Sequence, residues 1–388
     1  VLLHHVVKGR IHADAAAAAG EASTLAGTTL TFGYDNGLEV SGMRIMMPDL
    51  PARNGVIHIV DDVLLPPATA AAETVSTTSG PKKAIRLIER AIDAGLPTAT
   101  TVFVGGGTPT LVPADRLATI VSSIPVVADA EVTVECNPDD VTVEMLSTYR
   151  SAGVNRVSVG VQSMSAHVLD ALGRTHDRDN VAAAVEAIRR SGLPSFNLDI
   201  IYGAARETFS DWAATLDEVI GFDPSHVSAY GLTIEAGTPL AGQPERHPDD
   251  DDQADKYELA DERLTAAGLA NYEVSNWARP GHESRHNLLY WRQQSYRGFG
   301  CAAHSHSNGR RWWNVRTPER YVDLVNTGGQ VEAAAEVLDA ETRRSEGLQL
   351  LLRTRDGVPA NAFSPDTREL LAGLLVVHPD DADRVVLT

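Results

Sequence analysis

The chain has 388 residues, of which 43% are hydrophobic and 22% charged, enough for one large α/β domain or for two domains. Its formal net charge of −19 argues against binding to nucleic-acid backbones or anionic membrane surfaces, because both carry negative charge. The apolar runs have the length of β-strands, and we expect none of them to span a bilayer.

The first 68 residues have the pattern of a small β-rich unit. Short apolar or alternating runs predict strands at residues 2–7, 28–32, 38–40 and 56–65, with an alanine-rich helix at residues 14–20. The first five residues lack the basic start and long apolar core of a signal peptide, so we interpret them as the interior of a domain. Residues 69–82 have the small, polar composition of a linker.

Helices and strands alternate between residues 83 and 240. The first helix places Ile85, Ile88 and Ile92 on one face, and Gly95 follows it. Strands are predicted at residues 101–104, 131–135, 156–161, 196–202 and 226–233, and further helices at residues 113–124, 143–152, 180–191 and 209–220. This alternation predicts a parallel sheet, and its unbroken series favours a barrel or partial barrel over a doubly wound sheet.

The alternation ends after residue 240. Residues 248–252 read Pro-Asp-Asp-Asp-Asp and predict a solvated loop whose carboxylates cap a helix at residues 253–267. Residues 272–313 are rich in aromatic side chains and histidine. Helices are predicted again at residues 341–352 and 366–374.

Cysteine is scarce in this chain. Cys136 and Cys301 are the two cysteines, and they lie far apart in the sequence. Two such residues cannot build a disulfide framework or a cysteine-rich zinc site, and an iron–sulfur cluster usually needs three or four thiolates. We therefore assign no metal ligand and no catalytic residue from the sequence.

A glycine-rich turn follows the strand at residues 101–104. Gly105, Gly106 and Gly107 let the backbone approach a ligand closely, and their exposed N–H groups could bind a carboxylate or phosphate. A tight turn between a strand and a helix would explain three glycines about as well. Their position at the carboxyl end of a strand favours the binding interpretation.

Polar side chains also mark the ends of later strands. Glu135, Gln162 and Asp199 follow one another on successive strands, so we expect them in one barrel mouth. Together they indicate a small ligand with hydroxyl and amino groups. Arg174 either adds a carboxylate contact or is a surface arginine at a helix end.

The aromatic region predicts a second kind of site. Tryptophans, tyrosine and histidines could form a pocket that suits a porphyrin face, with imidazole as an iron ligand. The alternative is an aromatic core with hydrogen-bonded histidines. The residues concerned are Trp277, Tyr290, Trp291, Trp312 and Trp313, with His282, His286, His304 and His306.

Several of these motifs resemble one known family. Residues 101–110, Thr-Val-Phe-Val-Gly-Gly-Gly-Thr-Pro-Thr, resemble the second-strand motif of radical S-adenosylmethionine (SAM) enzymes. Residues 131–139, 154–163, 197–203, 272–276, 278–287, 290–291 and 311–316 are similar to the oxygen-independent coproporphyrinogen III oxidase-like branch and, within it, to the heme chaperone HemW subgroup. The resemblance covers about residues 83–388. It implies an α/β fold: a partial TIM-like (β/α) radical SAM barrel with a C-terminal α/β extension.

The resemblance also implies ligands and site residues. SAM would contact Gly105, Gly106, Gly107, Thr108, Pro109, Glu135, Gln162, Arg174 and Asp199, and heme would contact His286, Asn287, Tyr290 and Trp291 of the His-Asn-x-x-Tyr-Trp motif. Heme or a porphyrin and heme-acceptor proteins are the implied partners. The implied location is the cytoplasm.

The sequence departs from this family at one important place. The first barrel strand should end in Cys-x-x-x-Cys-x-x-Cys, which holds a 4Fe-4S cluster, but the predicted linker occupies that position. We therefore expect the barrel to lack its first strand and the chain to lack its own cluster and SAM cleavage. Residues 204–206 replace the family's Leu-Pro-Gly, and Cys301-Ala302 replaces Pro-Gly, so these loops should differ in shape.

The N-terminal segment resembles an unrelated family. Residues 2–9 and 54–67 are similar to the second half of a fasciclin domain, an extracellular adhesion module. The predicted domains are a partial fasciclin-like segment at 1–68, a linker at 69–82, the barrel at 83–240 and a C-terminal domain at 241–388.

Three functional hypotheses follow from these resemblances. The first is a HemW-like radical SAM protein of porphyrin and heme metabolism whose N-terminus has been replaced, by gene fusion or by a faulty gene model. The second is a non-enzymatic heme-binding or heme-transfer protein. The third is a chimeric product that acts as an extracellular fasciclin module.

Overall fold

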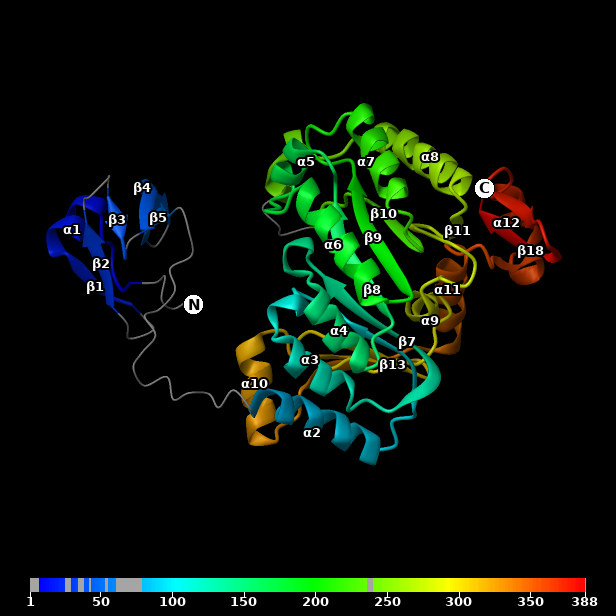
Figure 1. Ribbon diagram of the computed structural model, residues 1–388, viewed down its shortest axis with the longest axis horizontal. Helices are drawn as coiled ribbons and strands as arrows, with labels where there is room; N and C mark the ends of the chain where they lie inside the picture. Colours follow the sequence, from blue (N-terminus) through cyan, green and yellow to red (C-terminus); the bar gives the residue numbers. More distant parts are fainter. Residues whose placement is uncertain are drawn as a thin grey trace. The chain divides into compact units, whose positions relative to one another are not determined.

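A computed structural model describes residues 7–24, 29–33, 38–41, 43–52, 55–60, 79–235 and 240–387. The chain divides into two compact units, residues 1–79 and 80–388, and each is described by itself (Figure 1).

The N-terminal unit contains a five-stranded antiparallel sheet whose strands are neighbours in chain order. They are β1 (Glu21–Ser23), β2 (Thr29–Gly33), β3 (Glu39–Val40), β4 (Met43–Ala52) and β5 (Gly55–Val60). Helix α1 (Ala13–Ala19) ends at Gly20, which has the left-handed φ of 71° that favours glycine. Ala13, Leu30, Leu38, Val40 and Ile45 form the buried core of this unit.

Strands β1 and β4 are absent from the sequence-based expectation, whereas the strands expected at residues 28–32, 38–40 and 56–65 overlap β2, β3 and β5. Two prolines, Pro48 and Pro51, interrupt the apolar pattern of β4, and its pairing with β5 contains register shifts. The strand predicted at residues 2–7 lies outside the described residues except for Val7, which forms a bridge with Thr24.

The C-terminal unit is built on a curled seven-stranded sheet, which confirms the predicted partial barrel. Its order is β11-β12-β10-β9-β8-β7-β6, with β6 at one edge of the described sheet. Strands β6 to β10 are parallel, β12 pairs antiparallel with β10, and β11 pairs antiparallel with β12. Their bounds are β6 (Ala99–Val104), β7 (Val126–Cys136), β8 (Arg156–Gln162), β9 (Ser195–Tyr202), β10 (His226–Gly231), β11 (Ala270–Glu273) and β12 (Asn276–Ala278).

Amphipathic helices follow the parallel strands and pack with them into one hydrophobic core. The neighbouring pairs α3–α4, α4–α6 and α7–α8 are visible in Figure 1. Trp212 and Leu216 of α7 and Leu198 and Ile200 of β9 are fully buried in this core. The helices that follow the strands are α3 (Ala114–Val121), α4 (Val143–Ser151), α5 (Ala166–Ala171), α6 (Arg178–Ser191), α7 (Phe209–Gly221) and α8 (Asp250–Ala266), and α2 (Ser79–Asp93) precedes β6.

Two helix starts bear on the sequence-based expectations. Helix α2 begins at Ser79, inside the predicted linker, and Pro81 occupies its first turn, where a missing N–H costs no hydrogen bond. Helix α8 is capped as predicted, because the Asp249 carboxylate accepts a hydrogen bond from the backbone N–H of Asp252 at 2.9 Å.

The rest of the C-terminal unit adds two small sheets and further helices. One sheet contains β13 (His304–Ser307), β14 (Arg310–Asn314) and β15 (Glu332–Val337), and the other contains β16 (Val358–Pro359), β18 (Asp381–Leu387) and β17 (Leu375–His378). The helices are α9 (Arg285–Trp291), α10 (Pro318–Thr327), α11 (Ala340–Leu351) and α12 (Pro365–Leu370). Within the described part of the chain, no helix is both long and apolar enough to cross a membrane.

Candidate functional site

A cavity of about 410 Å³ lies at the carboxyl ends of the parallel strands. It brings together most of the residues that the sequence predicted for a small ligand. Its lining includes Gly107, Thr108, Pro109, Glu135, Gln162, Arg174 and Asp199. We call it the strand-end cavity.

The glycine turn after β6 fits tightly around Glu135. The backbone N–H of Gly106 donates to Glu135 Oε2 at 3.1 Å. A Cβ atom on Gly105 would stand 2.6 Å from the same oxygen and 2.7 Å from the ring of Phe103, so a side chain would displace the carboxylate. Gly106 and Gly107 have φ values of 82° and 87°, which residues other than glycine rarely adopt. These glycines therefore serve the site as well as the turn.

Hydrogen bonds from β8 and from its own strand, β9, fix Asp199. Ser158 Oγ donates to Asp199 Oδ2 at 2.7 Å, and Asn197 Nδ2 donates to Asp199 Oδ1 at 2.8 Å. The same amide nitrogen lies 2.9 Å from the hydroxyl of Ser228 on β10. The carboxylate is thus held in place before any ligand arrives, which lowers the entropic cost of binding.

A buried histidine, His226, fixes the orientation of Asn197 in this network. His226 Nδ1 lies 2.6 Å from Asn197 Oδ1, and His226 Nε2 lies 2.8 Å from the hydroxyl of Tyr272. Burial, helped by the charges of Arg156 and His282, holds the pKa of His226 well below its usual value, so the ring is neutral. Because Asn197 Oδ1 can only accept, Nδ1 carries the proton. His226 was not predicted as a site residue, because its only signal in the sequence is its place on a predicted strand.

The pKa values of both carboxyl groups in the cavity are raised, and a positively charged ligand would stabilise their ionised forms. Burial raises the pKa of Asp199, against the hydrogen bonds from Ser158, Ser228 and Asn197 and the charge of Arg156. Burial also raises the pKa of Glu135; the Gly106 N–H lowers it, and the charge of Asp199 raises it further. Two carboxylates in the strand-end cavity favour a ligand that carries a positive charge or several hydrogen-bond donors.

Gln162 and Arg174 complete the polar lining. Gln162 ends β8 with a φ of 63°, and its amide folds back over Gly160, where a Cβ atom would stand 2.7 Å from Nε2. Arg174 is exposed on the loop after α5, and the buried His176 anchors this loop through Nε2 at 2.8 Å from the carbonyl of Val161. The cavity therefore combines carboxylates with one guanidinium, a set that complements a zwitterion.

The cysteines do not fit an iron–sulfur cluster. Cys136 lines the strand-end cavity, but it is buried, its thiol lies 3.7 Å from the carbonyl of Val134, and burial raises its pKa to about 12. A thiol held protonated is a poor metal ligand. Cys301 precedes β13 in another sheet, and the described residues contain no group of three or more His, Cys, Asp or Glu side chains arranged for a metal.

One carboxylate of the barrel binds the start of the helix that carries the His-Asn-x-x-Tyr-Trp motif. Glu131 of β7 accepts hydrogen bonds from the backbone N–H groups of Arg285 and His286, each at 3.0 Å. This is the start of α9, where N–H groups lack partners inside the helix. Glu131, which the sequence analysis did not single out, thus places α9 against β6 and β7.

The motif splits into two faces of α9. His286 and Tyr290 share the face toward β6: His286 Nδ1 lies 2.8 Å from Thr101 Oγ1, Nε2 lies 2.8 Å from the Tyr290 hydroxyl, and the imidazole stacks on Phe103. Burial lowers the pKa of His286 to about 4, so this imidazole is neutral near pH 7. Asn287 and Trp291 lie on the other face and line a different cavity, beside β11 and β12, whose lining Tyr290 also joins.

The wider aromatic pocket predicted from the sequence does not form as one group. Trp277 is fully buried in the barrel core, and its Nε1 donates to Asp261 at 2.8 Å. His306 is buried, with Nδ1 3.0 Å from the carbonyl of Gln294 and Nε2 accepting from the backbone of Gly309. His304 stacks on Trp313 in the β13–β15 sheet. The alternative of an aromatic core with hydrogen-bonded histidines thus describes Trp277 and His306.

We expect Glu131→Gln to loosen α9 without unfolding the barrel. The amide can accept one of the two hydrogen bonds and turns an NH2 group toward the other donor, at a cost of about 2 kcal/mol. Hydrogen exchange of residues 285–291 should accelerate correspondingly. Glu186→Gln, exposed on α6, is the control. Unchanged protection of α9 would show that Glu131 does not hold it.

Comparison with known proteins agrees with this architecture. Residues 73–219 match the family model of the radical SAM superfamily, and residues 1–66 match that of the fasciclin domain. The heme chaperone HemW of Mycobacterium tuberculosis is 42% identical over 305 residues, which cover 75% of this chain and 77% of that protein. The heme chaperone HemW of Bacillus subtilis is 32% identical over 297 residues, or 74% and 78% of the two chains.

A solved structure shares the fold. Coproporphyrinogen III oxidase (HemN) from Escherichia coli, described as a radical SAM enzyme, superposes with a TM-score of 0.66 and 22% identity. The superposition covers 82% of this chain and 81% of that one. At this level of identity the likeness concerns the fold.

Proposed function

Because this chain belongs to the HemW family of the radical SAM superfamily, we propose that it binds heme and passes it to an acceptor protein. The observation that carries the proposal is the state of His286. Its imidazole is neutral, which is the form that ligates iron, and it sits in a half-buried aromatic setting on a helix fixed to the barrel. The cytoplasm is the location we propose, as the resemblance to heme chaperones implies.

Heme would use His286 Nε2 as its iron ligand. Thr101 Oγ1 can accept the Nδ1 proton, which fixes the ring orientation and leaves the Nε2 lone pair for iron. The Tyr290 hydroxyl now occupies that position, so it must turn away when iron binds. Tyr290 is 41% exposed, and its side chain therefore has room to move.

Heme titration of the full chain tests this assignment. We expect His286→Ala to weaken heme binding at least about tenfold and to shift the Soret band, because the imidazole that would ligate the iron is lost. Tyr290→Phe removes the competing hydroxyl and should retain or strengthen binding. His304→Ala, exposed in another sheet, is the control. A Soret band that His286→Ala leaves unchanged would contradict the proposal.

The strand-end cavity supports a second part of the proposal, the binding of SAM. Gly105, Gly106, Gly107, Thr108, Pro109, Glu135, Gln162, Arg174 and Asp199 would hold it. Buried carboxylates suit an amino group and ribose hydroxyls, and the guanidinium of Arg174 suits a carboxylate. In the superfamily SAM supplies a radical after reductive cleavage by a cluster, and the cysteines of this chain do not fit that cluster.

We expect Asp199→Asn to weaken SAM binding about tenfold, measured by calorimetric titration at pH 7.5. The amide removes a negative charge and places an NH2 group near the donors Ser158 and Asn197. Asp115→Asn, exposed on α3, is the control. Equal SAM affinity in all three proteins would remove Asp199 from the site.

Coproporphyrinogen oxidation is the alternative activity, since the fold is shared with that oxidase. It requires SAM cleavage, and we derive no step for it from these residues. Anaerobic iron and sulfide reconstitution discriminates the two activities. Retention of about four irons per chain after reconstitution, with 5′-deoxyadenosine formation, would favour the oxidase. Heme binding by a chain that retains no iron from the reconstitution would favour the chaperone.

A further inference from the structure

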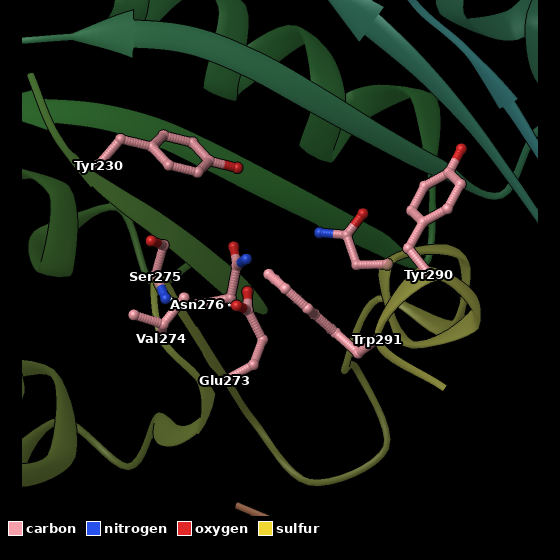
Figure 2. A pocket seen from close by; sticks show the side chains of 8 residues that line it. Tyr230, Glu273, Val274, Ser275, Asn276, Tyr290 and Trp291 are labelled. Carbon is pink, nitrogen blue, oxygen red and sulfur yellow. Dashed lines mark hydrogen bonds between the residues drawn. The ribbon is translucent and has the colours of Figure 1, made fainter. Parts of the chain in front are cut away.

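A second cavity lies between α9 and the hairpin of β11 and β12. Its volume is about 340 Å³, at the small end of the range for small-molecule sites. Figure 2 shows Tyr230 of β10, Glu273 and Asn276 of the hairpin, and Trp291 of α9 converging on it. Tyr230 also lines the strand-end cavity. We call this second cavity the hairpin pocket.

Three polar atoms around the hairpin pocket are buried and have no hydrogen-bond partner among the described residues. They are Glu273 Oε1, Asn276 Oδ1 and Trp291 Nε1. Glu273 is 1% exposed and Asn276 is 2% exposed. Leaving such an atom unsatisfied costs about 1–3 kcal/mol, so three at one cavity are unexpected in a region that serves packing alone. Two of the atoms accept and one donates.

The charge of the pocket restricts what could fill it. The residues that line it include a carboxyl group and no basic side chain. Burial raises the pKa of Glu273 to about 7, against the lowering effect of the backbone N–H of Ser275, 3.4 Å from Oε2. The phenols of Tyr230, Tyr257 and Tyr272 face this carboxyl and are uncharged near pH 7, because burial raises their pKa values. Arg353 lies 5.9 Å from the ring of Trp291.

We propose that the hairpin pocket binds a planar aromatic group that carries an NH2 function, an amide or an amidine. Its N–H groups would donate to Glu273 Oε1 and Asn276 Oδ1, and an amide carbonyl would accept from Trp291 Nε1. Tyr230, Tyr290 and Trp291 supply aromatic surface for the ring. A ligand carboxylate is disfavoured, because it would meet Glu273 with no cation in the lining.

This site goes beyond the heme and SAM sites proposed above. Heme coordination uses His286, which does not line the hairpin pocket, whereas Asn287, Tyr290 and Trp291 do. Its test needs neither heme nor SAM. Failure of one proposal therefore leaves the other open to its own measurement.

The experiment compares three probes of nearly the same shape on the full chain. Benzamidine is a cation with N–H donors, benzamide is neutral with donors and an acceptor, and benzoate is an anion without donors. Ligand-observed NMR titrations give the dissociation constants at pH 8 and pH 6. We expect benzamidine to bind at least about tenfold tighter than benzoate at pH 8, since one charge-assisted pair is worth about 1.5–3 kcal/mol. Lowering the pH to 6 should weaken benzamidine binding, because Glu273 takes up a proton.

Variants separate the contacts. Glu273→Gln should weaken benzamidine about tenfold and abolish the pH effect, while benzamide binding stays within about twofold. Trp291→Phe keeps an aromatic ring but removes the N–H, so it should weaken benzamide and leave benzamidine unchanged; it also tests the site if Glu273→Gln does not fold. Glu262→Gln, exposed on α8, should change nothing. Tighter binding of benzoate, no binding of any probe, or indifference of all probes to both variants would overturn the proposal.

Discussion

Lys256→Met is expected to lower the free energy of unfolding of the C-terminal unit by about 3–5 kcal/mol, because it leaves a buried carboxylate without its cation. The Lys256 ammonium lies 3.0 Å from Glu207 Oε2 and 2.7 Å from Asp252 Oδ2, and the side chains of Lys256 and Glu207 are fully buried. Burial opposes the charged ammonium, but the hydrogen bonds and charges of the two carboxylates outweigh it and raise the pKa of Lys256.

This ion pair also shapes the mouth of the barrel. Glu207 Oε2 accepts from the backbone N–H of Gly203, directly after β9, at 2.7 Å. The loop at residues 204–206, which departs from the family's Leu-Pro-Gly, is thus held by side chains at its end. Removal of Lys256 should therefore disturb the strand that carries Asp199.

Urea unfolding followed by tryptophan fluorescence measures the effect. All five tryptophans lie in the C-terminal unit, so the signal reports on that unit alone. The double variant Lys256→Met/Glu207→Gln removes both charges and should recover at least half of the loss. A loss below about 1 kcal/mol in the single variant would mean that solvent reaches Glu207.

Glu273→Gln should remove a pH-dependent destabilisation of about 3 kcal/mol from the ligand-free chain. The folded-state pKa of Glu273 is about 7, above its ordinary value of 4.5. The folded state therefore holds a proton that the unfolded state releases, and wild-type stability falls as pH rises from about 4.5 to 7. The shift corresponds to about 1.4 kcal/mol for each pH unit.

The measurement is the difference in unfolding free energy between wild type and variant at pH 4.5 and pH 8. Between pH 4.5 and pH 8 we expect Glu273→Gln to gain about 3 kcal/mol of unfolding free energy relative to wild type. Above pH 8 the difference should change little. Glu262→Gln is the matched control on an exposed helix face. A difference that stays constant with pH would show that Glu273 is ionised at no cost in the folded protein.

The grouping of polar residues at the strand-end cavity was predictable because parallel strands obey a simple geometric rule. Glu135, Gln162 and Asp199 each lie at or near the carboxyl end of a strand that hydrophobic runs had marked, and the structure places them in one cavity. The family motif added Arg174, for which the residue pattern alone left two interpretations. That these residues bind SAM stays a prediction.

Other parts of the site left no signal in the local pattern. In the sequence Glu131 is one polar residue of a strand. Its role comes from two backbone N–H groups of α9, about 150 residues later in the chain, which donate hydrogen bonds to it. His226 looks like a strand residue until Asn197 and Tyr272 enclose its two nitrogens. Such roles depend on contacts between distant segments.

The sequence by itself determined the alternation of helices and strands between residues 83 and 240, the two unrelated segments, the family and the scarcity of cysteine. These follow from side-chain periodicity, turn residues and composition, which are local along the chain. Tertiary structure alone decided that the His-Asn-x-x-Tyr-Trp motif divides between two faces of α9, that Trp277 belongs to the core, and that Glu273, Asn276 and Trp291 surround one cavity. The physical reason is that burial and the pairing of polar atoms are set by neighbours in space, which the spacing of residues along one element does not specify.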